Sequence, residues 1–233
     1  MRSKGIVCLT QLLIAVCLLA GTANRARAQA LPSGNFWGQG EVMFEVVGQV
    51  KNSPPAGPGL PPTSVQYGYL SHVKGLSDDQ IFLPGVAQNE ASALFTFYND
   101  SITEKVTVHG SLRIVIREGT TTIYYNPTPS GDLTTPLPDS FRQGTPILTT
   151  TWRHQVIIDN VVNPNATPRT NLFFVTFVHT ITSVTTLNLG SEAVSLGKVG
   201  DEFRQHFVGG VDFTGKVDGK FAGYAIAISA HHN

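Results

Sequence analysis

Residues 144–159, GTPILTTTWRHQVIID, and residues 171–189, NLFFVTFVHTITSVTTLNL, decide the fold. β-Branched and aromatic residues dominate both stretches and recur with a period of two, the pattern of strands with one buried face. Each stretch is also longer than the five or six residues of an ordinary strand. Long strands of this kind favour a closed barrel or a strongly coiled sandwich, in which sheet edges are removed or protected.

The same alternation continues over most of the chain, with Gly, Pro, Asn and Asp residues between the apolar segments. No segment has the periodicity of a helix longer than two turns. The other strand-like segments are residues 40–50, 64–74, 91–99, 106–109, 112–117, 121–125, 203–213 and 220–230. We therefore predict one all-β domain over residues 29–233. Its expected architecture is a single antiparallel β-barrel of about 8–10 strands, with a β-sandwich or jelly roll as the alternative.

Turn and loop residues divide these strands. Residues 53–62 and 126–139 each contain several prolines, which cannot donate hydrogen bonds to a sheet, and are expected to form long loops. Asp218-Gly219 predicts a tight hairpin turn near the end of the chain. Glu118-Gly119 predicts another turn, between the strand-like segments 112–117 and 121–125.

Segment 112–117 alternates between an apolar face and a face with two arginines. Leu112, Ile114 and Ile116 share one face. Arg113 and Arg117 lie on the other. Because charged side chains are seldom buried without a partner, we predict that both arginines face solvent.

The N-terminus has the three parts of an export signal. Arg2 and Lys4 give a positive start, residues 6–20 form an almost unbroken apolar run, and Ala26-Arg27-Ala28 is a cleavage site with small residues at the required positions. The apolar run is shorter than the roughly 20 residues that cross a bilayer. We therefore predict cleavage after Ala28, a secreted or periplasmic location, and no stable membrane insertion.

Cleavage at this position changes the composition of the chain. It removes four basic residues and no acidic one, which leaves 12 basic and 16 acidic residues in a mature chain of 205 residues. A mildly acidic chain without a Lys/Arg cluster argues against a nucleic-acid partner. Both cysteines, Cys8 and Cys17, leave with the signal, so the mature protein has no disulfide and no thiol nucleophile.

Signatures of catalysis and of metal binding are weak. The chain has no Gly-x-Ser-x-Gly motif, and its strand histidines are spaced one to a segment, without the His-x-His or His-Glu-x-x-His spacing of metal sites. We predict no metal and no cofactor. The residues favour a protein that is not an enzyme, although they leave that question open.

Aromatic residues are the main candidates for a ligand site. Such residues line an apolar cavity when they face into a barrel, and they stack on sugar rings when they lie outside. They also serve as ordinary core residues. The candidate ligand-binding residues are Tyr67, Tyr69, Tyr124, Tyr125, Trp152 and His154.

Three functional hypotheses follow. The first is an exported binding or structural module that holds a small apolar or amphipathic ligand. The second is a barrel-type enzyme, similar in kind to a cyclase or an isomerase, which needs a shaped pocket and few polar groups. The third is a surface adhesion or carbohydrate-binding module that uses Tyr124, Tyr125 or loop 126–139. The expected partners are a small apolar molecule or a glycan, and the oligomeric state is left open.

Overall fold

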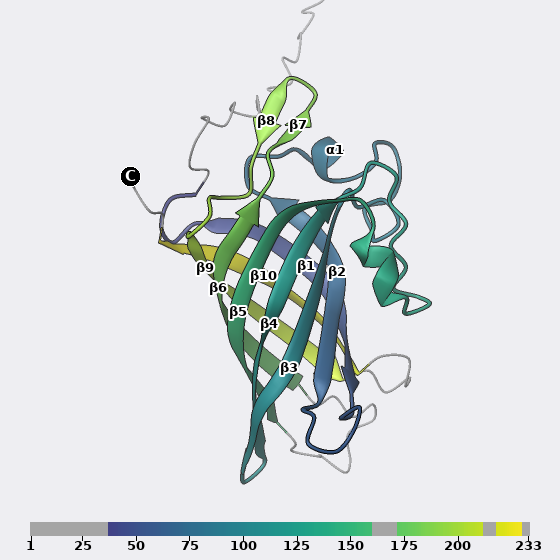
Figure 1. Cartoon of the computed structure of the whole chain (residues 1–233). Helices are drawn as coiled ribbons and strands as arrows, with labels where there is room; N and C mark the ends of the chain where they lie inside the picture. The colour runs from purple at the N-terminus through teal and green to yellow at the C-terminus, as the bar shows by residue number, and fades with distance from the viewer. Residues whose placement is uncertain (1–36, 160–171, 212–217, 230–233) are drawn as a thin grey trace, which may run out of the picture.

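The structure is a computed structural model that describes residues 37–159, 172–211 and 218–229 (Figure 1). Its two short helices are α1 (Asp78–Ile81) and the 3-10 helix η1 (Pro138–Arg142). Its strands are β1 (Val42–Ser53), β2 (Thr63–Val73), β3 (Phe95–His109), β4 (Leu112–Tyr125), β5 (Thr145–Asp159), β6 (Leu172–Val184), β7 (Leu187–Leu189), β8 (Glu192–Val194), β9 (Glu202–Val211) and β10 (Gly219–Ser229).

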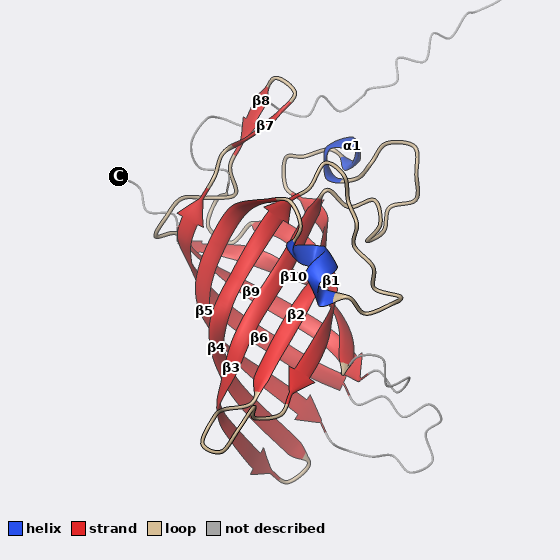
Figure 2. Ribbon diagram, turned by 45° about the vertical axis from the view of Figure 1, so that its right-hand side comes forward, coloured by secondary structure: helices blue, strands red, loops and turns tan. Residues whose placement is uncertain are grey.

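Long antiparallel strands close into a barrel in the order β1-β10-β9-β6-β5-β4-β3-β2 (Figures 1 and 2). Each strand pairs with its neighbours along the chain, apart from the small β7-β8 hairpin inserted between β6 and β9. The last strand returns to the first, with pairs from Val42–Ile226 to Val50–Gly219. The prediction of an antiparallel barrel is thus confirmed, and the alternative sandwich is not formed.

The predicted turn at Glu118-Gly119 is wrong, because residues 112–125 form one continuous strand, β4. Gly119 pairs with Ser101 on β3 and with Trp152 on β5. A Cβ atom on Gly119 would lie 2.8 Å from Cζ2 of Trp152 and would collide with the carbonyl oxygen of Asp100. The glycine therefore does not end a strand here: it leaves room inside the barrel for an indole ring.

The other loop predictions agree better with the structure. Residues 54–62 join β1 to β2, as expected for a proline-rich segment. Strands β9 and β10 form the predicted antiparallel pair, although Gly219 is the first residue of β10. Residues 160–171, between β5 and β6, and residues 212–217, between β9 and β10, lie outside the described residues.

One end of the barrel is closed by connecting segments. The segment with α1 and the β7-β8 hairpin lie at this end, which is uppermost in Figure 1. Apolar side chains from these segments are buried and continuous with the barrel core. They include Leu76, Ile81, Phe82, Leu94, Val194 and Leu196. The core therefore extends beyond the strands at this end.

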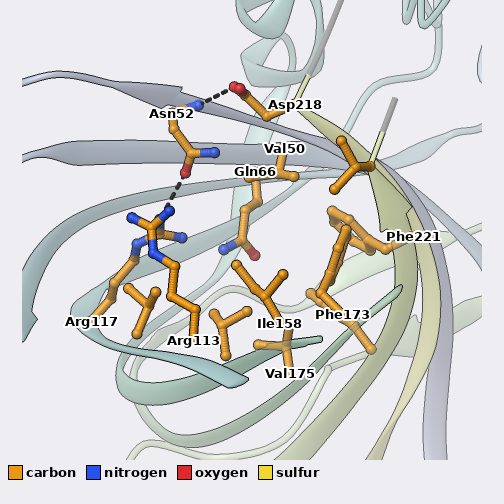
Figure 3. A pocket seen from close by; sticks show the side chains of 14 residues that line it. Val50, Asn52, Gln66, Arg113, Arg117, Ile158, Phe173, Val175, Asp218 and Phe221 are labelled. Atoms are coloured by element: carbon orange, nitrogen blue, oxygen red, sulfur yellow. Dashed lines mark hydrogen bonds between the residues drawn. The ribbon is translucent and has the colours of Figure 1, made fainter. Parts of the chain in front are cut away.

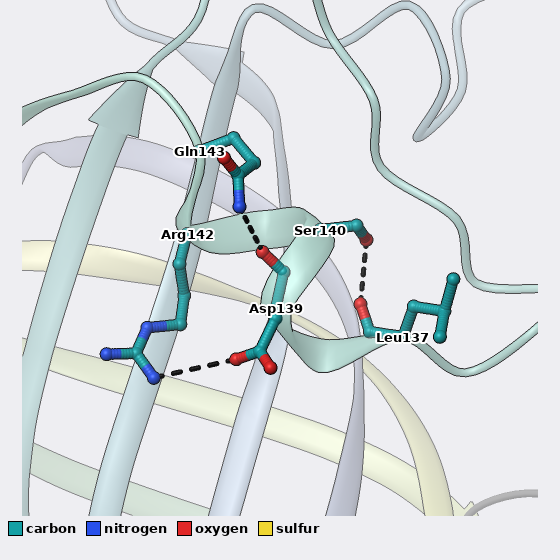
Figure 4. A network of polar contacts seen from close by, with 5 residues as sticks. All are labelled: Leu137, Asp139, Ser140, Arg142 and Gln143. Carbon is teal, nitrogen blue, oxygen red and sulfur yellow. Dashed lines mark hydrogen bonds and ion pairs between the residues drawn. The ribbon is translucent and has the colours of Figure 1, made fainter.

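The loop between β4 and β5 is fixed by its own hydrogen bonds (Figure 4). The Ser140 hydroxyl donates to the Leu137 carbonyl oxygen at 2.7 Å, and the Gln143 amide donates to the Asp139 carbonyl oxygen at 2.9 Å. Arg142 and Asp139 form an exposed ion pair at 3.5 Å. These contacts hold η1 as a compact turn.

Helix η1 covers the outer face of the barrel over β2 and β3. Phe141 is completely buried and packs on Tyr67 with ring centroids 5.4 Å apart. The Thr96 hydroxyl donates to the Phe141 carbonyl oxygen at 3.0 Å, and the Arg142 guanidinium lies 4.6 Å from the centre of the Tyr98 ring. The long loop predicted over residues 126–139 is therefore present, and with η1 it covers the outer face of the sheet.

Gly119→Ala tests the packing inside β4. We expect a loss of about 1–3 kcal/mol in the free energy of unfolding, because the added methyl group overpacks the contact with Trp152. Gly210→Ala on β9 is the matched control, since a Cβ there meets no atom within 4 Å, and it should change stability by less than about 1 kcal/mol. Urea unfolding measures both, and equal stability of the two variants would contradict this packing.

Candidate functional site

A cavity of about 240 Å³ lies inside the barrel at the end opposite the α1 segment. It lies where β1 ends and where β2 and β4 begin, and strands from around most of the barrel contribute to its wall (Figure 3). Its apolar lining consists of Val50, Val115, Val156, Ile158, Phe173, Val175, Phe207, Val211 and Phe221. Because these side chains face inward from the strands, the cavity is a space that the barrel core leaves unfilled.

Five polar side chains complete the lining of this cavity. Asn52, Arg113, Arg117 and Asp218 lie at its rim (Figure 3). Gln66 is buried, and its Oε1 accepts a hydrogen bond from Asn99 at 3.3 Å. The prediction that both arginines face solvent is correct for Arg113, which is exposed, and wrong for Arg117, which is half-buried, and the face predicted for them is wrong. Both lie on the inner face of β4 with Val115, which is 2% exposed, and both line the cavity.

Arg117 is half-buried and is held by neutral oxygen atoms. Its Nη2 donates to Asn52 Oδ1 at 2.7 Å, its Nε donates to Thr103 Oγ1 at 3.2 Å, and its Nη1 donates to Ser64 Oγ at 3.3 Å. Among the described residues, no carboxylate lies within ion-pair distance of Arg117. The side chain is therefore positioned firmly but not neutralised.

Burial and a second cation both lower the pKa of Arg117. Burial, and then the nearby Arg113 guanidinium, lower the pKa of Arg117 to about 10, while Asp218 acts in the opposite direction. Arg117 thus remains a cation at neutral pH. Asp218 accepts a hydrogen bond from the backbone N–H of Asn52 at 2.7 Å, so its carboxylate lies at the same rim.

His154 and Trp152 lie on the inner face of β5, one layer deeper than the cavity. Their rings stack with centroids 4.8 Å apart, and the edge of Phe177 contacts His154. The indole N–H of Trp152 and both ring nitrogens of His154 are buried without a hydrogen-bond partner. Burial, the charge of Arg117 and then His179 lower the pKa of His154 to about 2, so its imidazole is neutral at pH 7.

A second buried histidine, His179 on β6, has its hydrogen bonds satisfied. Its Nε2 lies 3.1 Å from Gln205 Oε1, and its Nδ1 lies 2.9 Å from the Thr150 hydroxyl. Since an amide oxygen only accepts, Nε2 carries the proton and Nδ1 accepts from Thr150. Burial lowers the pKa of His179 to about 3, although the Gln205 contact acts in the opposite direction.

The tyrosines among the sequence candidates lie away from the cavity. Tyr67 faces outward under η1, its hydroxyl donates to Gln49 Oε1 at 3.1 Å, and burial raises its pKa to about 12. Tyr69, on the same face, contacts the edge of Phe82, and burial raises its pKa as well. These two residues pack the cover of the barrel.

The remaining tyrosine candidates end strand β4. Tyr124 is half-buried and packs against the aromatic cluster beneath η1. Tyr125 faces inward at the closed end and packs on Phe95 with ring centroids 5.3 Å apart. Among the sequence candidates, the structure therefore brings Trp152 and His154 together and places both near the cavity.

Sequence reasoning missed the polar residues that line the cavity. Asn52, Gln66 and Asp218 come from three different strands or their ends, and no spacing in the sequence connects them. The arginines were assigned to the wrong face because Ile114 and Ile116 look like core residues, yet both are half-exposed. The signal that could have found Arg117 is the alternation along residues 112–125. If these residues are recognised as one unbroken strand, Arg117 falls on the same face as Val115.

Two broader properties concern the described residues alone. No group of three His, Cys, Asp or Glu side chains lies close enough to hold a metal ion. Within the same ranges, no helix has the length and apolar character needed to span a membrane.

Comparison with known proteins gives no family for this chain. No family model matches it, and neither the curated proteins nor the solved structures include a significant match. The function must therefore be argued from the cavity and its rim.

His154→Phe tests the buried neutral imidazole. The pKa of His154 is about 2 in the folded protein and about 6.5 in the unfolded chain. Between these pH values the unfolded chain binds more protons than the folded protein. The wild type therefore loses stability as pH falls below about 6.5. The stability of the variant relative to wild type should rise by up to about 1.4 kcal/mol per pH unit as pH falls from 6 to 4.

Urea unfolding at pH 7, 5.5 and 4.5 measures this difference. His72→Phe, at an exposed position on β2, is the control and should keep the wild-type dependence on pH. Parallel stability curves for His154→Phe and wild type would show that the His154 imidazole is not held neutral by burial.

Proposed function

We propose that this barrel is a binding module that holds a small apolar or amphipathic molecule in the cavity at its end. The cavity itself carries the proposal. Its wall is built mainly from valine, isoleucine and phenylalanine side chains, and four of its five polar side chains lie at the rim. An apolar interior with a few polar groups in fixed positions is the usual composition of a small-molecule site.

The volume of the cavity limits the size of the ligand. An apolar cavity of about 150 Å³ is known to hold benzene, whereas drug-sized ligands occupy about 300–1,000 Å³. The cavity here is about 240 Å³, between these values. By the benzene ratio it takes about ten non-hydrogen atoms, which is a medium-length alkyl chain or one substituted ring.

The alternative functions have less support. A general base works best with a pKa near the operating pH, whereas the pKa of His154 is about 2 and its nitrogens are buried beneath the cavity. A carbohydrate-binding surface needs exposed aromatic rings, whereas Tyr124 and Tyr125 are both half-buried. We therefore place the enzyme and the adhesion module second to ligand binding.

Export of the protein remains part of this proposal. It rests on the pattern in residues 1–28, which lie outside the described residues. An exported barrel of this kind would meet its ligand outside the cytoplasm.

Octan-1-ol, a neutral amphipathic molecule of suitable size, tests the proposal. We expect saturable binding with a rise in melting temperature, since ligand at 100 times its Kd stabilises the fold by about 2.7 kcal/mol. Val156→Phe fills the cavity wall and should abolish this rise. Differential scanning fluorimetry and calorimetric titration measure it.

Val208→Phe is the matched control, because Val208 is 52% exposed on the outer face of β9. It should leave octan-1-ol binding unchanged. Binding that survives Val156→Phe but is lost in Val208→Phe would move the site to the outside of the barrel. The proposal would be refuted if wild type bound neither octan-1-ol nor octanoate, its carboxylate counterpart.

A further inference from the structure

The rim of the cavity carries more positive charge than its own residues neutralise. Arg113 and Arg117 are its cations, and Asp218 is its carboxylate. Neither arginine is within ion-pair distance of a carboxylate in the described part of the chain. Among the described residues, two guanidinium groups that influence each other therefore share the rim with a single anion, which gives these residues a net charge of plus one.

Arg117 is arranged to receive a further partner. A guanidinium has five N–H groups, and three of those on Arg117 donate to Asn52, Ser64 and Thr103. Among the residues that the structure describes, the second N–H on each Nη nitrogen has no acceptor. Since a partly buried cation is costly unless it is paired, this geometry favours an incoming anion.

Arg113 and the apolar wall complete the site. Arg113 is exposed and makes no hydrogen bond or ion pair with a described residue, so its guanidinium is free to turn toward a ligand. In Figure 3 the guanidinium groups of Arg113 and Arg117 lie together beside Asn52, and the side chains of Ile158 and Val175 belong to the apolar part of the same cavity. A ligand therefore meets charge at the rim and hydrocarbon below it.

We propose that the ligand is an amphipathic carboxylate, with its carboxylate group bound by Arg113 and Arg117 and its apolar portion in the cavity. This inference rests on the proposed function and specifies its ligand. A carboxylate matches the planar, forked donors of arginine, and its single charge balances the excess of one at the rim. A phosphate dianion would leave an excess negative charge beside Asp218.

Octanoate and octan-1-ol have the same chain length, so comparing their affinities separates the contribution of the carboxylate from that of the hydrocarbon. At pH 7.5, isothermal titration of the purified protein should show octanoate binding about tenfold or more tightly than octan-1-ol, because charge-assisted hydrogen bonds are the strong ones. Arg113→Gln and Arg117→Gln should each lower octanoate affinity much more than octan-1-ol affinity, and so remove most of this preference. Arg153→Gln is the control, since Arg153 lies outside the barrel and pairs with Glu104.

Each outcome has a defined meaning. If octanoate and octan-1-ol bind equally in wild type, or if the arginine variants keep the preference, the carboxylate inference is overturned while the proposed function stands. If neither molecule binds, both fail. Should Arg117→Gln not fold, Arg113→Gln at its exposed position and Arg117→Lys, which keeps the charge but loses the fork, still decide the matter: both should weaken octanoate binding.

Discussion

The pairing of β1 with β10 is the constraint on which the rest of the structure depends. It joins the first strand of the barrel to the last, so that the sheet has an inside and no open edge. Once the sheet is closed, alternate residues of every strand must share one narrow interior. A barrel of eight strands has room for little more than its own side chains or one small ligand.

The interior is filled unequally along its axis. At one end, segments between the strands add buried apolar side chains to the core. In the middle, large rings pack against glycines. Phe97 and Phe221 lie where a Cβ atom of Gly48 would be, and Trp152 lies where a Cβ atom of Gly119 would be. At the other end the side chains do not meet, and the cavity of about 240 Å³ remains. The candidate site is therefore the part of the interior that the side chains leave unfilled.

The period-two pattern was sufficient to predict an all-β fold, because burial of one strand face is a local property of the sequence. The length of the strands favoured a barrel but left a β-sandwich as the alternative. The period-two pattern failed where the chain departs from the rule of one buried face. Gly119 resembled a turn residue although its role is to admit Trp152, and Ile116 resembled a core residue although Arg117 faces the interior. The contact between Trp152 and His154 could be anticipated, because the two residues share a face of a single strand. The grouping of the rim residues could not, because only strand order and register bring them together.

Methyl-resolved NMR during a titration with octanoate tests the central claim most directly, namely that a ligand enters the barrel at its unfilled end. We predict that the largest shift changes occur at the methyl groups of Val50, Val115, Val156 and Val175, which line the cavity. Changes confined to exposed methyl groups such as those of Val208 would contradict it, because they would place the ligand on the outer surface.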